Sequence, residues 1–136
     1  ASIGLCGHSM GGHGALTLFQ KHPGKFRSLS AFAPICAASQ SSWSNKAFTA
    51  YFGDDLAQWK AHDACELLQT QGPLNVPILV DQGMSDPFLQ RLQPELLEAA
   101  AAKVGQHLTL RRHQGYDHGY FFVQSFIEDH LRHHAE

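Results

Sequence analysis

The amino-acid sequence predicts an α/β fold in which helices cover a parallel β-sheet. Strand-like and helix-like segments alternate along the 136 residues, and no internal repeat or low-complexity linker interrupts them. This alternation is typical of parallel sheets, because two parallel strands need a long crossover connection that is usually a helix. A second observation is the turn Gly7-His8-Ser9-Met10-Gly11, which joins an apolar run to a helix-like segment. The chain is also long enough for one domain with a substantial core.

The first three elements follow from apolar runs and from the turn residues that end them. Residues 2–7 form a short apolar run that ends at a glycine, which predicts a central strand. We expect a helix over about Met10–Lys21, because residues 22–24 contain a proline that cannot continue it and a glycine that suits its exit. Arg27–Ala33 alternates and then turns apolar, so we expect the next strand there, closed by Pro34.

The middle of the chain predicts a loop followed by helices. Residues 37–45 are rich in serine and alanine and follow a strand, which indicates a loop. We expect a short helix over residues 46–52, stopped by a glycine. Asp54 or Asp55 is then expected to cap a further helix that runs on toward Leu68.

The second half of the chain predicts two further strands, each followed by a helix. Val76–Asp81 is the clearest strand after the first, and His107–Arg112 reads as the last one. Helices are expected from about Gln93 to Lys103 and over about Tyr120–His133. The buried stripe of the first helix is expected to be Leu96, Leu97, Ala100 and Val104. The inward face of the second is expected to be Phe122, Val123, Phe126, Ile127 and Leu131.

Composition limits the classes of partner. Hydrophobic residues make up 43% of the chain and charged residues 16%, which is ordinary for a globular protein. The formal net charge of −2 gives no reason to expect nucleic acid or an anionic membrane as a partner. No apolar run is long enough to span a bilayer, and no signal peptide opens the sequence.

The cysteines favour a cytoplasmic location. Cys6, Cys36 and Cys65 are odd in number and form no C-x-x-C pair, and two of them lie in apolar runs. We therefore expect buried, reduced thiols in a cytosolic protein rather than a disulfide or a zinc site.

The Gly-x-Ser-x-Gly turn carries the strongest chemical signal. With a strand before it and a helix after it, this pattern predicts a nucleophile elbow, in which Ser9 adopts positive φ and exposes its hydroxyl. Gly7 and Gly11 are expected to crowd the turn, where a side chain would not fit. The Met10 amide at the start of the helix would face a developing oxyanion. The competing interpretation is a glycine–serine turn without chemistry.

A nucleophilic serine needs a base within hydrogen-bond reach and an acid that orients the base. Elbow enzymes of the three-layer α/β-hydrolase fold present these in the chain order Ser, Asp or Glu, His. Asp86 lies in the loop after the third predicted strand, and His118 lies in the loop after the last one. Asp81 and Asp117 are rival acids, but Asp81 is still in its strand and Asp117 is adjacent to the base. The predicted catalytic residues are therefore Ser9, Asp86 and His118.

Five other histidines raise further possibilities. His8 and His13 flank the elbow, where they would either touch substrate or make structural hydrogen bonds. His130, His133 and His134 have the i, i+3, i+4 spacing of a metal site on one helix face. We expect a solvated helix end there instead, because histidine is favourable near the negative pole of a helix. No metal is predicted.

The loop after the second predicted strand supplies candidate substrate contacts. In open α/β sheets, ligands bind outside the carboxyl ends of the strands. Trp43 in this loop is therefore either a wall of the substrate site or a plug of the core. We take Trp43, Lys46 and His8 as candidate substrate-binding residues.

Several motifs together resemble one family over nearly the whole chain. They are Gly7–Ala15, Ser30–Cys36, Trp43 with Lys46-Ala47-Phe48, Asp81-Gln82-Gly83 with Asp86, Gly115–His118 and Asp129–His134. In this order they resemble S-formylglutathione hydrolase, also called esterase D. The combination is far more specific than the Gly-x-Ser-x-Gly pattern alone.

The resemblance implies an α/β-hydrolase fold, no cofactor and no metal. It implies a cytosolic thioesterase that cleaves S-formylglutathione to glutathione and formate, the last step of glutathione-dependent formaldehyde detoxification, with activity on small acyl esters. Residue by residue, Ser9 matches the nucleophile, Asp86 the acid and His118 the base, and Met10 supplies one oxyanion amide. The implied partner is a small thioester, a glutathione conjugate.

The chain is shorter than the resemblance implies. Members of that family are about twice as long, and an elbow strand lies at the middle of the sheet. We therefore expect residues 1–136 to be the C-terminal part of a single α/β-hydrolase domain, with the second oxyanion donor outside this chain. An exposed sheet edge would then invite association, including a homodimer. The alternatives are a general carboxylesterase or acyltransferase of the same fold, and a catalytically incomplete fragment that associates through this edge.

Overall fold

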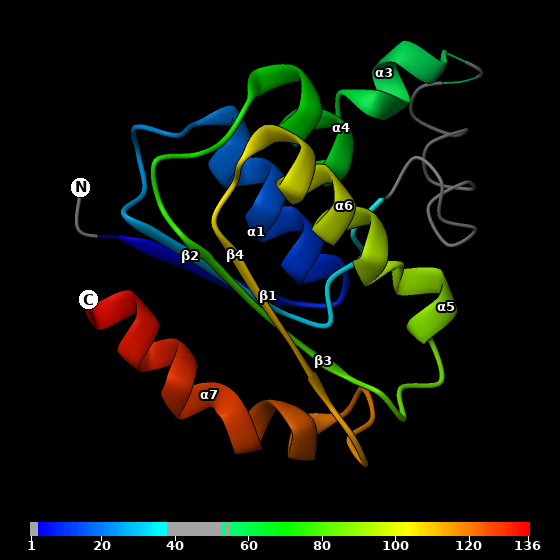
Figure 1. Ribbon diagram of the computed structural model, residues 1–136, viewed down its shortest axis with the longest axis vertical. Coiled ribbons are helices and arrows are strands. Elements are labelled where there is room, and N and C mark those ends of the chain that lie inside the picture. The colour runs from blue at the N-terminus through cyan, green and yellow to red at the C-terminus, as the bar shows by residue number, and fades with distance from the viewer. Residues whose placement is uncertain (1–2, 38–52, 54) are drawn as a thin grey trace.

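The computed structural model describes residues 3–37, 53 and 55–136, and it contains a four-stranded sheet. The strands lie in the order β1-β2-β3-β4, and each pairs with the next in parallel (Figure 1). They span Gly4–His8 (β1), Ser28–Phe32 (β2), Ile78–Gly83 (β3) and Leu108–His113 (β4). The predicted parallel α/β class is confirmed, and the predicted strands lie within two residues of the observed ones at each end.

Helices cover both faces of this sheet and make three layers. α1, α4 and α6 lie on one face, and α7 crosses the other (Figure 1). Their bounds, with the two short helices, are Met10–Lys21 (α1), Leu56–Lys60 (α3), Ala64–Gln71 (α4), Leu89–Leu92 (α5), Pro94–Val104 (α6) and Tyr120–Ala135 (α7). In the described part of the chain, no helix is long and apolar enough to cross a membrane.

Two apolar cores hold the layers together. The larger lies between the sheet and α1, α4 and α6, where Phe19 of α1 packs with Leu29 of β2 and Val80 of β3. The smaller lies under α7 at the carboxyl end of β2, around Phe32 and Phe122. Their rings meet edge to face at 5.9 Å. Both faces of the central strands are therefore buried, which explains why their sequences are almost continuously apolar.

The helical region after Gly53 differs from the prediction. The single helix expected to run toward Leu68 is divided into α3 and α4, because Asp63 starts a new helix. Its buried side chain accepts a hydrogen bond from the Glu66 amide at 3.0 Å, as an N-cap does. Asp55 caps α3 as expected, accepting from the amides of Ala57 and Gln58. The short helix α5 was not predicted, and the predicted helix over 46–52 lies outside the described residues.

The inward faces of α6 and α7 are partly as expected. In α6, Leu97 and Ala100 are buried, whereas Leu96 and Val104 pack only partly against the core. In α7 the expected residues Phe122, Val123 and Phe126 pack inward. Ile127 and Leu131 are 38% and 63% exposed, so their predicted burial is wrong. The buried polar contacts of α7, described below, require a different face of this helix to point toward the sheet.

Candidate active site

Ser9 occupies a sharp turn between β1 and α1. Its φ of 59° and ψ of −118° confirm the predicted positive φ of the elbow. Such a backbone conformation costs a non-glycine residue about 1–3 kcal/mol and persists only where its surroundings enforce it. Here the Ser9 amide donates to the Phe32 carbonyl at 2.9 Å, and the Ser9 carbonyl accepts from the amides of Ile35 and His13.

Close packing at the elbow requires glycine at two positions. A Cβ at Gly7 would collide with the backbone of Gly11 and lie 2.8 Å from the Gly12 nitrogen. A Cβ at Gly12 would lie 2.9 Å from the Pro34 Cβ. Around Gly11 itself the space is open, so the predicted crowding at that position is wrong. Gly11 is exposed, and the tight approach falls one residue later, at Gly12.

Asp86 and His118 form a hydrogen-bonded pair. The Asp86 Oδ2 and His118 Nδ1 atoms are 2.6 Å apart, and the Asp86 residue is 5% exposed. The same carboxylate accepts from Gln82 Nε2 at 3.0 Å and from the Phe88 amide at 2.7 Å. Three donors therefore fix the carboxylate, which in turn orients the imidazole and leaves its Nε2 for a reacting group.

The three predicted catalytic residues lie at one edge of the sheet. Ser9 follows β1, Asp86 follows β3 and His118 follows β4, and the carboxyl ends of parallel strands share an edge (Figure 1). The ring of His8 lies 4.6 Å from that of His118, centroid to centroid. The residue before the serine therefore contacts the histidine of the Asp–His pair. This edge is where open α/β sheets bind ligands.

The histidines that flank the elbow have different surroundings. Burial lowers the pKa of His8, and its Nε2 is buried without a hydrogen-bond partner in the described part of the protein. His13 instead has a structural contact, because its Nε2 accepts from the Ala64 amide at the start of α4. Burial lowers the pKa of His13 to about 4, so this ring is a neutral acceptor at neutral pH.

The remaining candidate residues are Met10, Trp43, Lys46 and Asp117. Met10 is the first residue of α1, so its amide has no acceptor within the helix and is available to an anion. Trp43 and Lys46 lie outside the described residues. The Asp117 side chain accepts a hydrogen bond from the Gly119 amide at 2.8 Å, a contact within its own loop.

Asp81 is the centre of a buried polar cluster on the α7 side of the sheet. Its carboxylate is fully buried and accepts from Arg111 at 2.6 and 2.8 Å. His113 and His130 lie 2.7 Å from its oxygens. Burial alone would raise the pKa of Asp81, but hydrogen bonds from His130, Arg111 and His113 hold it well below its usual range. The carboxylate of this rival acid is therefore occupied by contacts with β4 and α7.

The three C-terminal histidines do not form the solvated helix end that we expected. His130 is 1% exposed, is stacked on Phe32 at 3.7 Å and contacts Ser30 Oγ at 2.8 Å. His134 Nε2 also contacts Ser30 Oγ at 2.8 Å, and His133 Nε2 donates to a β2 carbonyl at 2.9 Å. Within the described residues, no group of three or more His, Cys, Asp or Glu side chains is placed to hold a metal.

The cysteines are all unpaired. Cys36 and Cys65 are buried, as expected, whereas Cys6 on β1 is exposed, which the sequence did not predict. Burial raises the pKa of Cys36 and of Cys65. Although Cys6 is exposed as a residue, partial desolvation of its thiol acts to raise its pKa, and hydrogen bonds with His130 and Ser30 outweigh this and bring the pKa below its usual value.

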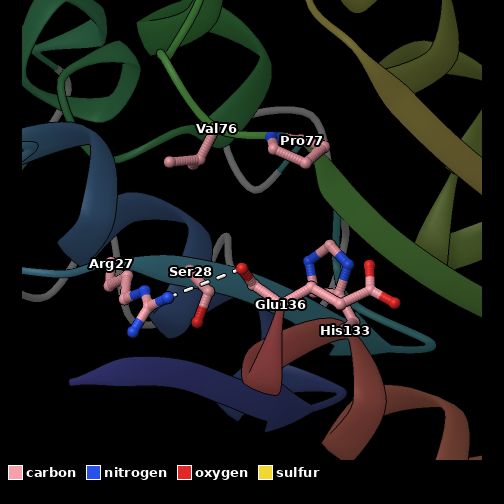
Figure 2. A pocket seen from close by; sticks show the side chains of 6 residues that line it. All are labelled: Arg27, Ser28, Val76, Pro77, His133 and Glu136. Carbon is pink, nitrogen blue, oxygen red and sulfur yellow. Dashed lines mark hydrogen bonds between the residues drawn. The ribbon is translucent and has the colours of Figure 1, made fainter. Parts of the chain in front are cut away.

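A small pocket lies away from the candidate site. It has a volume of about 200 Å³ and is bounded by Arg27, Ser28, Val76, Pro77, His133 and Glu136 (Figure 2). Ser28 starts β2 and Pro77 precedes β3, so the pocket is at the amino edge of the sheet, opposite the elbow. Its Arg27 donates to the Glu136 carbonyl. It contains none of the predicted catalytic residues.

The chain is similar in sequence to known esterases. The family described as "Putative esterase" matches residues 2–133. The S-formylglutathione hydrolase of Paracoccus denitrificans is 55% identical over 133 residues, which are 98% of this chain and 47% of that protein. The mouse (Mus musculus) S-formylglutathione hydrolase is 47% identical over 136 residues, 98% of this chain and 48% of its own.

A solved structure is also similar. The S-formylglutathione hydrolase from Agrobacterium tumefaciens superimposes with a TM-score of 0.91 at 47% identity, covering 96% of this chain and 47% of that one. The chain spans about half the length of the curated relatives it matches. By sequence and by fold, the chain belongs to the esterase family and has the architecture of an α/β-hydrolase.

Proposed function

We propose that this chain carries the nucleophile, base and acid of a serine thioesterase that hydrolyses S-formylglutathione to glutathione and formate. The observation that carries the proposal is the Asp86–His118 pair, with 2.6 Å between Oδ2 and Nδ1, at the same sheet edge as the strained Ser9. The substrate follows from the names of the relatives, which are S-formylglutathione hydrolases at 47–55% identity.

In the first half of the proposed reaction, Ser9 is acylated. His118 Nε2 takes the hydroxyl proton as Ser9 Oγ attacks the thioester carbonyl, and Asp86 stabilises the imidazolium that forms. The tetrahedral intermediate then collapses, the C–S bond breaks, and His118 returns the proton to the departing glutathione thiolate. The product is a formyl ester on Ser9.

In the second half, water replaces glutathione. His118 takes a proton from a water molecule, whose oxygen attacks the formyl ester. The ester bond breaks, Ser9 Oγ recovers its proton from His118, and formic acid leaves and ionises in water to formate. One histidine thus serves as base and acid in turn, which explains why its Nδ1 is held so closely by Asp86.

The negative charge on the carbonyl oxygen needs donors at the elbow. We assign one to the Met10 amide at the N-terminus of α1. The second donor belongs to residues outside this chain. Removing one such donor costs about 3 kcal/mol of transition-state stabilisation, so both halves of the site contribute to the rate.

The proposal also covers the domain organisation, the cellular location and the oligomeric state of the chain. We assign residues 1–136 to part of a single α/β-hydrolase domain, since β1 pairs only with β2 among the described residues and the relatives are about twice as long. Three unpaired cysteines favour the reducing cytosol. For residues 1–136 alone, the free edge of β1 favours a homodimer.

The test is S-formylglutathione hydrolysis by the native full-length protein and its Ser9→Ala variant. We expect the variant to lose on the order of 10⁴-fold or more in kcat, since the covalent step disappears. His22→Ala, at the exposed end of α1, is the control and should keep native turnover. Unchanged hydrolysis in Ser9→Ala would exclude Ser9 as the nucleophile.

A second comparison separates the thioesterase from a general carboxylesterase or acyltransferase. The same acyl group is offered as a glutathione thioester and as an oxygen ester. Preference for the thioester supports the proposal, whereas rapid turnover of oxygen esters alone would keep the triad and discard the substrate. A folded protein that neither turns over esters nor reacts with a fluorophosphonate, but associates, would favour a binding role.

A further inference from the structure

The ring of His8 lies against the imidazole of His118. Their centroids are 4.6 Å apart and the ring planes are inclined by 39°. His8 is the last residue of β1 and immediately precedes Ser9, whereas His118 lies in the loop between β4 and α7. The contact therefore joins the elbow to the loop that carries the proposed base.

Three side chains surround the His118 ring. Asp86 holds its Nδ1 at 2.6 Å, but a single hydrogen bond leaves a ring free to swing about that contact. Phe88 approaches His118 edge to face, with centroids 5.3 Å apart and planes at 82°. His8 supplies the third contact, from the side of the elbow. Together these contacts restrict the direction in which His118 Nε2 points.

His8 is also electrically suited to this position. Burial lowers the pKa of His8 and the charge on His118 lowers it further, against smaller opposing effects of the His118 backbone and of Asp86. A neutral His8 places no positive charge beside the imidazolium that forms on His118 during acylation. A charged group at this distance would oppose that proton transfer.

We propose that His8 is a positioning residue for the base, packing its flat ring against His118 so that the imidazole stays between Asp86 and Ser9. The inference rests on the proposed function, in which His118 moves the proton of Ser9. Small displacements of reacting groups are costly, and about 1 Å can reduce a rate about 100-fold. A ring at position 8, rather than a hydrogen bond from it, is the feature that the proposal requires.

The kinetic test uses the native full-length protein with His8→Ala and His8→Phe. We expect His8→Ala to lower kcat for S-formylglutathione by about 10- to 100-fold with KM nearly unchanged, because positioning is lost but the substrate contacts remain. His8→Phe keeps a flat ring and should recover most of the native kcat. His107→Ala removes an exposed histidine just before β4, at the opposite edge of the sheet, and should match the native protein.

A spectroscopic test does not depend on the substrate. The proton in the short hydrogen bond between His118 Nδ1 and Asp86 is strongly deshielded and should give a far-downfield ¹H resonance, which Asp86→Ala removes. We expect this signal to broaden or vanish in His8→Ala and to persist in His8→Phe and His107→Ala. Circular dichroism of each variant verifies that it is folded.

The outcomes separate this inference from the proposed function. Native kcat and an unchanged resonance in His8→Ala would overturn the positioning role. Equal losses of kcat in the alanine and phenylalanine variants, with the resonance intact, would also overturn it and would assign His8 Nε2 to a substrate contact. If the native protein does not hydrolyse S-formylglutathione, the proposed substrate fails, while the resonance still decides the role of His8.

Discussion

At the scale of single residues, the candidate site consists of side chains that are held by several contacts each. The Asp86 carboxylate accepts from Gln82, from the Phe88 amide and from His118. Ser9 keeps its positive φ because the backbone of β2 and of the following loop hydrogen-bonds to it. An unfavourable backbone geometry such as that of Ser9 persists only where several surrounding contacts enforce it.

Asp86→Asn should impair the reaction without unfolding the protein. An amide can donate to His118 Nδ1 and stabilise the wrong tautomer, which leaves no base at Nε2. We expect kcat to fall on the order of 10⁴-fold, measured with S-formylglutathione. The matched control is Asp117→Asn. Asp117 is adjacent to the base in sequence, and the contact described above is with the Gly119 amide, so kcat of this variant should stay close to that of the native protein. Equal losses in both variants would contradict the assignment of Asp86.

Gly7→Ala should disrupt the elbow. The added Cβ would meet the backbone at the start of α1, which cannot move aside as a flexible side chain could, and overpacking of this kind costs about 1–3 kcal/mol. We expect a lower melting temperature and slower fluorophosphonate labelling of Ser9. Gly14→Ala, at an exposed position of α1 with open space around it, should raise helix stability by about 0.5–1 kcal/mol. Native-like labelling of Gly7→Ala would show that the turn tolerates a side chain.

At the scale of elements, α7 is attached to the sheet by polar contacts as much as by its apolar face. His130 connects Asp81 of β3 with Ser30 of β2, and Arg111 of β4 connects Asp81 with Asp129 of α7. Because Asp81, His130 and Ser30 are buried together, they can be satisfied in only one rotational setting of the helix. That requirement explains why Leu131 remains exposed while His130 is inside.

Stability should depend on pH through this cluster. The lowered pKa of Asp81 gives stability that is fully present above its unfolded pKa of about 3.9 and is lost as pH falls below that value. Burial lowers the pKa of His130, but its contact with Asp81 outweighs this and raises it. Its contribution is therefore present below about pH 6.5 and is lost as pH rises through the raised value.

The measurement compares urea unfolding of the native protein and of Asp81→Asn across this range. The variant leaves the buried His130 and the partly exposed Arg111 without their carboxylate, and breaking a buried pair costs about 3–5 kcal/mol. The difference in unfolding free energy should be greatest between about pH 4 and pH 6.5 and should shrink on either side. Glu98→Gln, which breaks only the exposed pair with Arg112, is the control and should cost little at any pH. If the difference in unfolding free energy between the native protein and Asp81→Asn does not change with pH, the electrostatic origin of this stability is refuted.

At the scale of the whole molecule, the described chain forms a three-layer unit whose sheet has β1 and β4 as its edge strands. β1 is paired only with β2 among the described residues, although it carries the elbow. An unpaired strand edge is a template for another strand. In a protein as long as the relatives, further strands are expected to use it.

Residues 1–136 expressed alone should therefore associate, whereas the full-length protein should not do so through β1. We expect concentration-dependent sedimentation of the 136-residue chain, with protection of β1 amides from hydrogen exchange as association proceeds. Sedimentation of the full-length protein supplies the comparison. A folded, monomeric 136-residue chain at high concentration would show that the edge of β1 does not direct assembly.

Much of the fold and of the candidate site was predictable because its signals are local. Apolar runs, proline and glycine located the strands to within two residues, and the Gly-x-Ser-x-Gly pattern between strand and helix predicted the positive φ of Ser9. The chain order of the site singled out Asp86 and His118, which the structure brings within 2.6 Å. The break before α4 was missed, because Asp63 acts as a cap only through the fold that buries it.

The sequence by itself determined the alternation of elements, the elbow and the edge at which Ser9, Asp86 and His118 gather, since these depend on neighbours along the chain and on the rule that parallel strands end together. Only the tertiary structure decided which polar residues are buried. Asp81, His130 and Ser30 come from three separate elements, and no sequence spacing relates them. The contact of His8 with His118 has the same origin, because only the tertiary packing brings the end of β1 to the loop after β4.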